Sequence, residues 1–206
     1  EAFVRPWAGM SGQPVDADLA AALGLDRPGG IVISELHEDS PFAAAGFVRG
    51  DVIVAVDDQP VNTPAEMVFR MSVAGLGAEA EVTRLRDGAR EAVAVAMTAA
   101  PDTPDRDQRI MDERSPLPGL TVVNVNPAVL AEYNLPLATR GVIVAAPGPY
   151  GARLGLRPGD VILAINGTET TQSAQVPEAL IIALQQRGIA VDVLRGTQRL
   201  SLRGRL

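Results

Sequence analysis

An eight-residue block occurs twice in the 206-residue chain. It reads Gly-Phe-Val-Arg-Gly-Asp-Val-Ile over residues 46–53 and Gly-Leu-Arg-Pro-Gly-Asp-Val-Ile over residues 155–162, an offset of 155 − 46 = 109. Each block is preceded by a shorter match, Gly-Ile-Val-Ile at 30–33 and Gly-Val-Ile-Val at 141–144. Because both matches keep nearly the same spacing, the sequence predicts two sister domains of roughly 100 residues each.

A stretch rich in proline and aspartate separates the two copies, over residues 99–116. Such a composition, with few apolar residues, is typical of a linker. The ordered ligand spacing and the glycine of a calcium-binding loop are missing from it. We therefore predict a first domain over residues 1–98, a linker over 99–116 and a second domain over 117–206.

The composition argues against several classes of function. All 18 basic residues are arginine, the net charge is −7 and aromatic residues make up 3% of the chain, so no nucleic-acid-binding surface is expected. Cysteine is absent, which excludes disulfides and thiol catalysis. No apolar run reaches the ~18 residues of a membrane span, so membrane insertion is not expected. The chain lacks a signal-peptide pattern and starts abruptly at Glu1, which favours an excised fragment.

Local patterns predict several elements of the first copy. Helices are expected to follow polar N-cap residues, two of which precede a proline: Asp16, Ser40 and Thr63. Strands are expected where β-branched residues concentrate, at residues 31–33 and 52–56. The pair Asp87-Gly88 lies between two alternating segments and predicts a β-hairpin.

A short loop near the N-terminus, Trp7-Ala8-Gly9-Met10, precedes the polar Ser11. Small residues at its centre leave the consecutive N–H groups of Ala8, Gly9 and Met10 free to face one concavity. Such a nest of amides suits an anion, for example the C-terminal carboxylate of a peptide. We expect Trp7 and Met10 to line an apolar pocket beside it.

With this loop, the segment Ser-Pro-Phe-Ala-Ala-Ala-Gly and the repeated Gly-Asp-Val-Ile block, the chain resembles a tandem of PDZ domains over residues 4–98 and 117–205. The order of parts resembles the circularly permuted bacterial form, in which the carboxylate-binding loop leads the domain. The resemblance implies a mixed α+β fold, each domain being a small, partly open β-barrel or sandwich capped by two or three helices. Two such domains in succession resemble the C-terminal half of HtrA/Deg-type bacterial serine proteases, and bacterial PDZ pairs also occur in membrane metalloproteases.

The resemblance implies two peptide-binding grooves. In the first, a peptide would add as a strand beside Ser11 and the residues after it, between the loop and a helix that contributes Met67, Arg70 and Met71. Thioether side chains adapt to apolar residues of varied shape, although plain core packing is the alternative for methionines at i and i+4. In the second, the matching residues are Leu117, Gly119, Leu120, Val176, Ala179 and Leu180.

Pro118 occupies the place in the second loop that Ala8 has in the first. Proline has no N–H group, so the second nest loses one donor. Two interpretations stay open: the second domain binds peptide through a weaker loop, or it mainly docks and assembles.

Ser11, His37 and Asp51 could be combined into a hydrolase triad. The Gly-x-Ser-x-Gly pattern fails, however, because Gln13 stands where its second glycine belongs. His37 is the only histidine and lies among acidic residues, so a solvated loop side chain is expected. We predict no catalytic residue, no metal site and no cofactor; an autonomous hydrolase is the alternative from the enzyme class.

Together, the residues and the resemblance imply the peptide-binding regulatory region of an HtrA-like serine endopeptidase of the periplasm, with the protease domain outside this chain. The expected partners are C-termini or extended segments of unfolded envelope proteins, and the protease domain of the same polypeptide, through which the protein would form homo-oligomers. The alternative is a PDZ adaptor or scaffold of a secretion system, or of another envelope protease such as a membrane metalloprotease.

Overall fold

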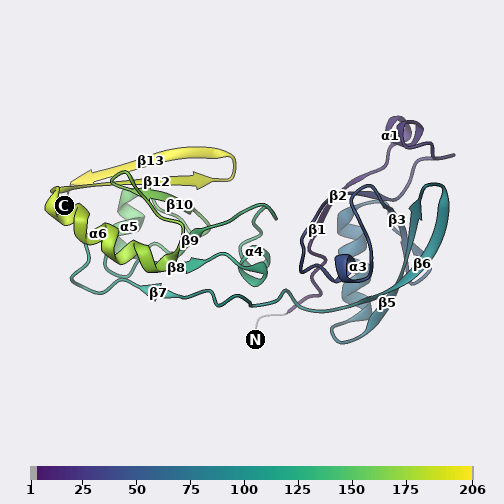
Figure 1. The fold of residues 1–206 in the computed structure, drawn as a ribbon, viewed down its shortest axis with the longest axis horizontal. Helices are drawn as coiled ribbons and strands as arrows, with labels where there is room; N and C mark the ends of the chain where they lie inside the picture. The colour runs from purple at the N-terminus through teal and green to yellow at the C-terminus, as the bar shows by residue number, and fades with distance from the viewer. Residues whose placement is uncertain (1–3, 206) are drawn as a thin grey trace. The chain divides into compact units, whose positions relative to one another are not determined.

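The computed structural model describes residues 4–205 of the chain. The chain forms two compact units, and the division falls between Pro101 and Asp102 (Figure 1). We call residues 4–101 the first unit and residues 102–205 the second unit. No helix in the described part of the chain is long and apolar enough to cross a membrane.

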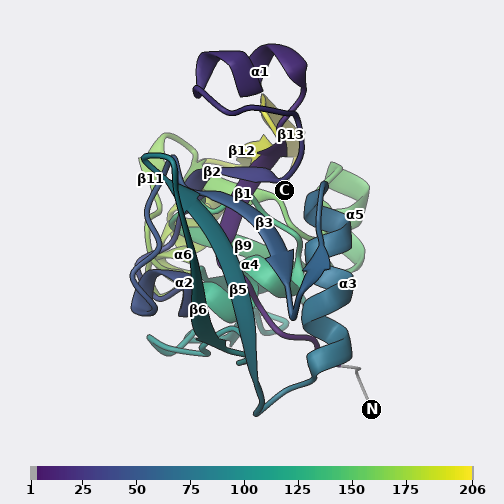
Figure 2. The same cartoon turned by 90° about the vertical axis from the view of Figure 1, so that its right-hand side faces the viewer.

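The first unit is built on an antiparallel sheet with the strand order β1-β2-β3-β5-β6, and β4 pairs with β3. Strand β1 therefore lies at one end of the sheet. Helix α3 packs against β1, β3 and β5 (Figure 2). The elements are β1 (Met10–Pro14), α1 (Ala17–Ala22), β2 (Ile31–Leu36), α2 (Pro41–Ala44), β3 (Val52–Val56), β4 (Gln59–Pro60), α3 (Pro64–Ala74), β5 (Glu79–Arg86) and β6 (Ala89–Ala96).

Polar side chains close the helix N-termini that the sequence predicts. Asp16, Ser40 and Thr63 each accept a hydrogen bond from a backbone N–H of the first turn, at 2.8, 3.0 and 3.2 Å. The predicted hairpin is β5–β6, in which Asp87 and Gly88 adopt φ values of 50° and 77°. A two-residue hairpin turn of type I′ requires positive φ at both central positions, so these predictions are confirmed.

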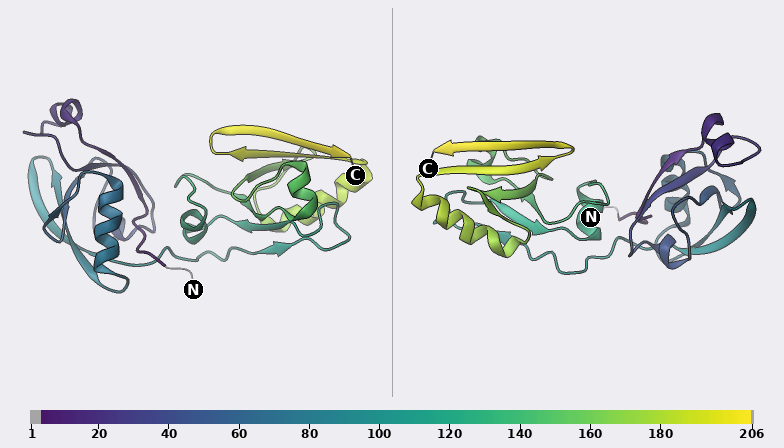
Figure 3. Two further views of the ribbon diagram at one scale, coloured as in Figure 1. Left: turned by 180° about the vertical axis from the view of Figure 1, so that it is seen from behind. Right: turned by 45° about the horizontal axis from the view of Figure 1, so that its top comes forward.

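The second unit repeats this plan with one addition. Its sheet has the order β13-β12-β10-β9-β8-β7, with β11 paired to β10, and ends in the long β12–β13 hairpin (Figure 3). The elements are β7 (Arg109–Ile110), β8 (Thr121–Asn124), α4 (Pro127–Glu132), β9 (Val142–Ala146), α5 (Gly148–Leu154), β10 (Val161–Ile165), β11 (Thr168–Glu169), the 3-10 helix η1 (Ser173–Gln175), α6 (Val176–Gln185), β12 (Gly188–Arg195) and β13 (Gln198–Arg205).

The added strand β7 comes from the stretch that the sequence assigns to a linker. It pairs antiparallel with β8. Just before it, Arg106 forms ion pairs with Asp102 (3.0 Å) and Glu132 (2.9 Å). Most of this stretch thus contacts the second unit, and the exact domain boundary stays a prediction that proteolysis can test.

Each unit has its own apolar core, built from aliphatic side chains with few aromatic ones. In the first unit Phe42 and Phe47 are the aromatic members, with ring centroids 5.2 Å apart. The sheets are open, because within residues 4–205 the first and last strands of each sheet do not pair with each other. The mixed α+β prediction is therefore confirmed, and both sheets are open rather than closed barrels.

Candidate peptide-binding grooves

The loop at residues 7–10 is anchored through its carbonyl groups. The His37 amide donates a hydrogen bond to the Gly9 carbonyl oxygen (2.8 Å). The Ser40 hydroxyl donates to the Ala8 carbonyl oxygen (2.6 Å). The carbonyl side of the loop is consequently fixed to the segment that joins β2 to α2.

The amide side of the same loop is open. Among the residues that the structure describes, neither the Ala8 nor the Gly9 amide donates a hydrogen bond. Met10 pairs with Leu36 of β2 in an antiparallel ladder. In such a ladder the backbone N–H and C=O groups of every second residue point toward the partner strand, and those of the residues between point away from it. Since the Gly9 carbonyl faces β2, the Met10 N–H faces the other edge. Three consecutive donors are therefore available to an anionic group.

Gly9 is required by both its conformation and its surroundings. Its φ of +60° is a region that side chains rarely adopt. A Cβ atom at this position would lie 2.8 Å from the Trp7 ring and 2.9 Å from the Ser40 Cβ. Trp7 thus covers one side of Gly9, and its ring stands edge-on to that of His37, 5.5 Å between centroids. Trp7 supports the loop in this structure; its contact with a peptide stays a prediction.

The edge of β1 that faces away from β2 is unpaired in the described chain. Ser11 lies on this strand and is half-buried. A strand with a free edge beside a helix is the arrangement to which an extended peptide can add. The three amides of the loop lie at the start of this edge, so a strand added here would end on them.

Of the helix residues that the resemblance implies, two lie in the core. Met67 and Met71 are 2% and 0% exposed, and Ala8 and Met10 pack against the same apolar cluster. Arg70 lies elsewhere, with its guanidinium 5.6 Å from the centroid of the exposed Phe69 ring. The loop and the two methionines are thus brought together, whereas a role of Arg70 in peptide binding stays a prediction.

The second loop uses its amides within the chain. The Gly119 N–H donates to the Met111 carbonyl oxygen (2.9 Å), and the Leu120 N–H donates to the Leu117 carbonyl oxygen (3.1 Å). Pro118 has no N–H to offer. No donor of this loop therefore corresponds to the free donors of the first.

The edge of β8, which matches the edge of β1, is also occupied. Strand β7 pairs along it, and Met111 directly follows β7. Met111 is 5% exposed and belongs to one apolar cluster with five residues that the sequence assigns to the second groove, namely Leu117, Leu120, Val176, Ala179 and Leu180. Sequence reasoning missed Met111 and β7; the only indication was two apolar residues, Ile110 and Met111, in a polar stretch.

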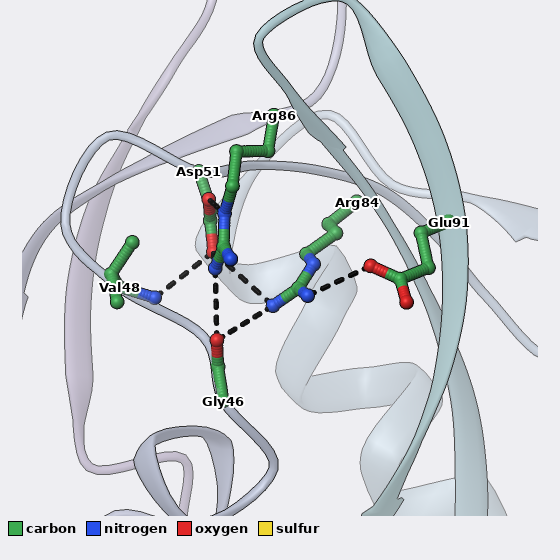
Figure 4. A network of polar contacts seen from close by, with 6 residues as sticks. All are labelled: Gly46, Val48, Asp51, Arg84, Arg86 and Glu91. Atoms are coloured by element: carbon green, nitrogen blue, oxygen red, sulfur yellow. Dashed lines mark hydrogen bonds and ion pairs between the residues drawn. The ribbon is translucent and has the colours of Figure 1, made fainter.

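The repeated aspartate of the Gly-Asp-Val-Ile block has a structural role. The Asp51 side chain accepts hydrogen bonds from the Arg86 guanidinium (both 2.7 Å) and from the Val48 amide (2.9 Å), while Arg84 and Arg86 both donate to the Gly46 carbonyl oxygen (Figure 4). Burial alone raises the pKa of Asp51. The hydrogen bonds and the two arginine charges outweigh burial, so the pKa is lowered overall.

The second unit repeats this network. Arg195 donates two hydrogen bonds to Asp160 (2.7 and 2.8 Å) and one to the Gly155 carbonyl oxygen (2.7 Å). The Arg157 amide also donates to Asp160 (2.9 Å). The motif therefore ties the loop before β3 to the β5–β6 hairpin in the first unit, and the loop before β10 to the β12–β13 hairpin in the second. It stabilises the fold, and hydrogen bonds engage both carboxylate oxygens of Asp51 and of Asp160.

The structure gives no support to the hydrolase alternative. The His37 side chain is 8% exposed and packs on Trp7, so the prediction of a solvated histidine is wrong. Its Nδ1 atom accepts a hydrogen bond from the Asp39 amide (3.1 Å). Within residues 4–205, no hydrogen bond joins His37 to Ser11 or Asp51, and no group of three acidic or histidine side chains is placed to hold a metal ion.

An open sheet edge beside a helix, with a glycine-containing loop at its end, defines a class of peptide-recognition domain. Comparison with protein families assigns it: models described as PDZ domain match residues 10–97 and residues 141–195. The chain belongs to the PDZ-domain family and carries two copies of the domain.

The chain is further similar to proteins named probable periplasmic serine endoprotease DegP-like. It is 30% identical to that of Pseudomonas fluorescens over 198 residues and 31% identical to that of Pseudomonas savastanoi over 197 residues. Each match covers 93% of this chain and 40% of the relative, so the chain spans well under half of their length. Among solved structures, an HtrA-type protease, AlgW with decapeptide, is 26% identical with a TM-score of 0.43, covering 48% of this chain and 30% of that one.

Proposed function

We propose that the first unit binds the C-terminal residues of extended peptides. The peptide adds as a strand to the free edge of β1, and its carboxylate accepts hydrogen bonds from the amides of Ala8, Gly9 and Met10. Its last side chain enters an apolar pocket between the loop and α3, next to Met67 and Met71. The observation that carries this proposal is the set of unengaged amides at the end of an unpaired strand.

The proposal extends to the whole protein through its relatives. Because they are named periplasmic serine endoproteases, we infer that this chain is the regulatory peptide-binding part of such an enzyme in the bacterial envelope. Captured C-termini or extended segments of unfolded proteins are presented to a protease domain of the same polypeptide, which also forms the oligomer.

The test compares a short peptide that ends in valine with the same peptide amidated at its C-terminus. A hydrogen bond to a charged group contributes ~1.5–3 kcal/mol, so amidation should weaken binding to the chain by roughly tenfold or more. Titration by fluorescence anisotropy measures both affinities. Equal affinities would contradict recognition of the carboxylate.

A matched variant probes the loop itself. Ala8→Pro removes a donor that has no hydrogen-bond partner among residues 4–205, and the second loop already carries proline at this position. The variant should weaken binding of the free-acid peptide by roughly tenfold and leave the affinity for the amidated peptide nearly unchanged. An equal loss for both peptides would indicate a distorted loop rather than a lost carboxylate donor.

A further inference from the structure

The second groove already contains a strand. Residues 106–111 run antiparallel to β8, with Arg109 opposite Val122 and Ile110 opposite Thr121 (Figure 1). A cleft lined by Met111 on one side and by Pro177 and Leu180 of α6 on the other shows that this segment lies next to the helix as well. The segment thus lies where a peptide would add to the sheet.

The end of this segment reproduces the contacts expected of a bound C-terminus. The Met111 N–H donates to the Leu120 carbonyl oxygen (2.8 Å), and the Met111 carbonyl oxygen accepts from the Gly119 N–H (2.9 Å). Gly119 corresponds to Gly9 in the repeat, so a carbonyl group occupies the place of a carboxylate. The Met111 side chain is 5% exposed and packs with Leu180.

The beginning of the segment is fastened too. The Asn124 N–H donates to the Arg106 carbonyl oxygen (2.7 Å). Asp107 accepts a hydrogen bond from the Ser173 hydroxyl (2.7 Å) and forms an ion pair with Arg109 (2.9 Å). Residues 106–111 are therefore held by pairing with β8, by the apolar pocket around Met111 and by the hydrogen bond from Ser173 of η1.

We propose that residues 106–111 are the internal ligand of the second groove, and that this groove recognises extended segments of the pattern Asp-x-x-x-Met, through the aspartate side chain and through the side chain and carbonyl group of the methionine. It needs no free carboxylate, unlike the first groove. The inference takes the docking geometry from the proposed function but concerns a separate groove. An attached ligand acts at an effective concentration on the order of millimolar, so free peptides at micromolar concentration leave it in place.

The experiment uses the full chain and the peptide Pro-Asp-Arg-Asp-Gln-Arg-Ile-Met with an amidated C-terminus, which copies residues 104–111. Amidation preserves the neutral carbonyl group to which the Gly119 N–H donates, and it disfavours binding of the peptide to the first groove. The variant Met111→Asp places a carboxylate in the apolar pocket, so the internal segment should leave. Ile110→Asp is the control, because the Ile110 side chain is 65% exposed.

We expect Met111→Asp to bind the peptide at least about tenfold more tightly than either the wild-type chain or Ile110→Asp. Hydrogen exchange should place the new protection on β8 and α6. Equal binding by all three proteins would overturn the proposal, and so would a folded Met111→Asp chain that binds no peptide.

A second measurement decides the matter if Met111→Asp fails to fold. In the wild-type chain, the amides of Met111 and Gly119 should exchange slowly, like those of the neighbouring strands, whereas exchange at the rate of an unstructured peptide would overturn the proposal. Failure of the proposed function is distinguishable, because the valine peptide reports on the first groove only.

Discussion

Asp51 and Asp160 show why one short motif recurs in the sequence. Each carboxylate is 1% exposed and is held by an arginine of a distant hairpin, Arg86 or Arg195. A buried carboxylate is tolerated only with such partners. The most specific sequence motif of the chain is thus a structural one, while the candidate grooves depend on less specific residues.

The change Asp51→Ala should lower the stability of the first unit. It leaves the Val48 amide without its acceptor and takes from the buried Arg84 one of its two carboxylate partners, the other being Glu91; removal of one partner of a buried ion pair costs about 3 kcal/mol. Urea unfolding followed by hydrogen exchange in each unit measures the effect. Asp26→Ala, at an exposed position, is the control, and a loss of similar size there would contradict the assignment.

The ion pair between Asp51 and Arg86 also predicts that the stability of the first unit depends on pH. Because the pKa of Asp51 is lowered in the folded state, its stabilisation is complete above the unfolded value of about 3.9 and is lost as the pH falls through the folded pKa. The stability difference between wild type and Asp51→Ala should therefore be constant from neutral pH to about pH 5 and shrink below about pH 4. A difference that already shrinks near neutral pH would contradict a lowered pKa.

At the scale of elements, strand β7 makes the stretch between the domains testable by proteolysis. Arg106 is half-buried in ion pairs and Arg109 lies in β7, whereas Arg114 is exposed in a turn. Within residues 99–116, trypsin should therefore cut first after Arg114. Mass spectrometry of early time points identifies the site, and a first cut after Arg109 would show that β7 is not paired.

Elements fixed by local chemistry could be predicted from the sequence. Helix caps at Asp16, Ser40 and Thr63 and the hairpin at Asp87 depend on neighbouring residues only. The strand β7 depends instead on pairing with β8 and on burial of the Met111 side chain that follows it, while the Ile110 side chain is exposed and the surrounding residues are polar. A two-residue strand within a polar stretch has no detectable periodicity, so the sequence predicts a linker there.

The candidate site could be predicted only in part, because local patterns determine some of its features and contacts between distant residues determine the others. The small residues of the first loop indicate a nest of amides, and the structure leaves those of Ala8 and Gly9 unengaged. Methionines at i and i+4 give the same sequence pattern whether they line a binding pocket or pack in the core, so the pattern does not distinguish the two roles. The packing of His37 on Trp7 is likewise a contact between distant residues that no local pattern encodes.

Taken whole, the molecule carries two copies of one domain in different states. The first copy has an unpaired edge strand and free loop amides, and the second has its edge paired and its loop amides engaged by its own chain. This difference involves Pro118, which stands where the first copy has Ala8, and the segment around Met111, which pairs with β8. One copy is open to ligands, and the other is filled.

We propose that one groove of the two binds a free C-terminus. The most direct measurement is a titration of the full chain with the valine-ended peptide, followed by hydrogen exchange at each amide. We predict a stoichiometry of one peptide per chain, with new protection confined to Ala8, Gly9, Met10 and β1. Protection of β8 and the second loop at Gly119 to the same extent, with two peptides bound per chain, would show instead that both grooves bind a free C-terminus.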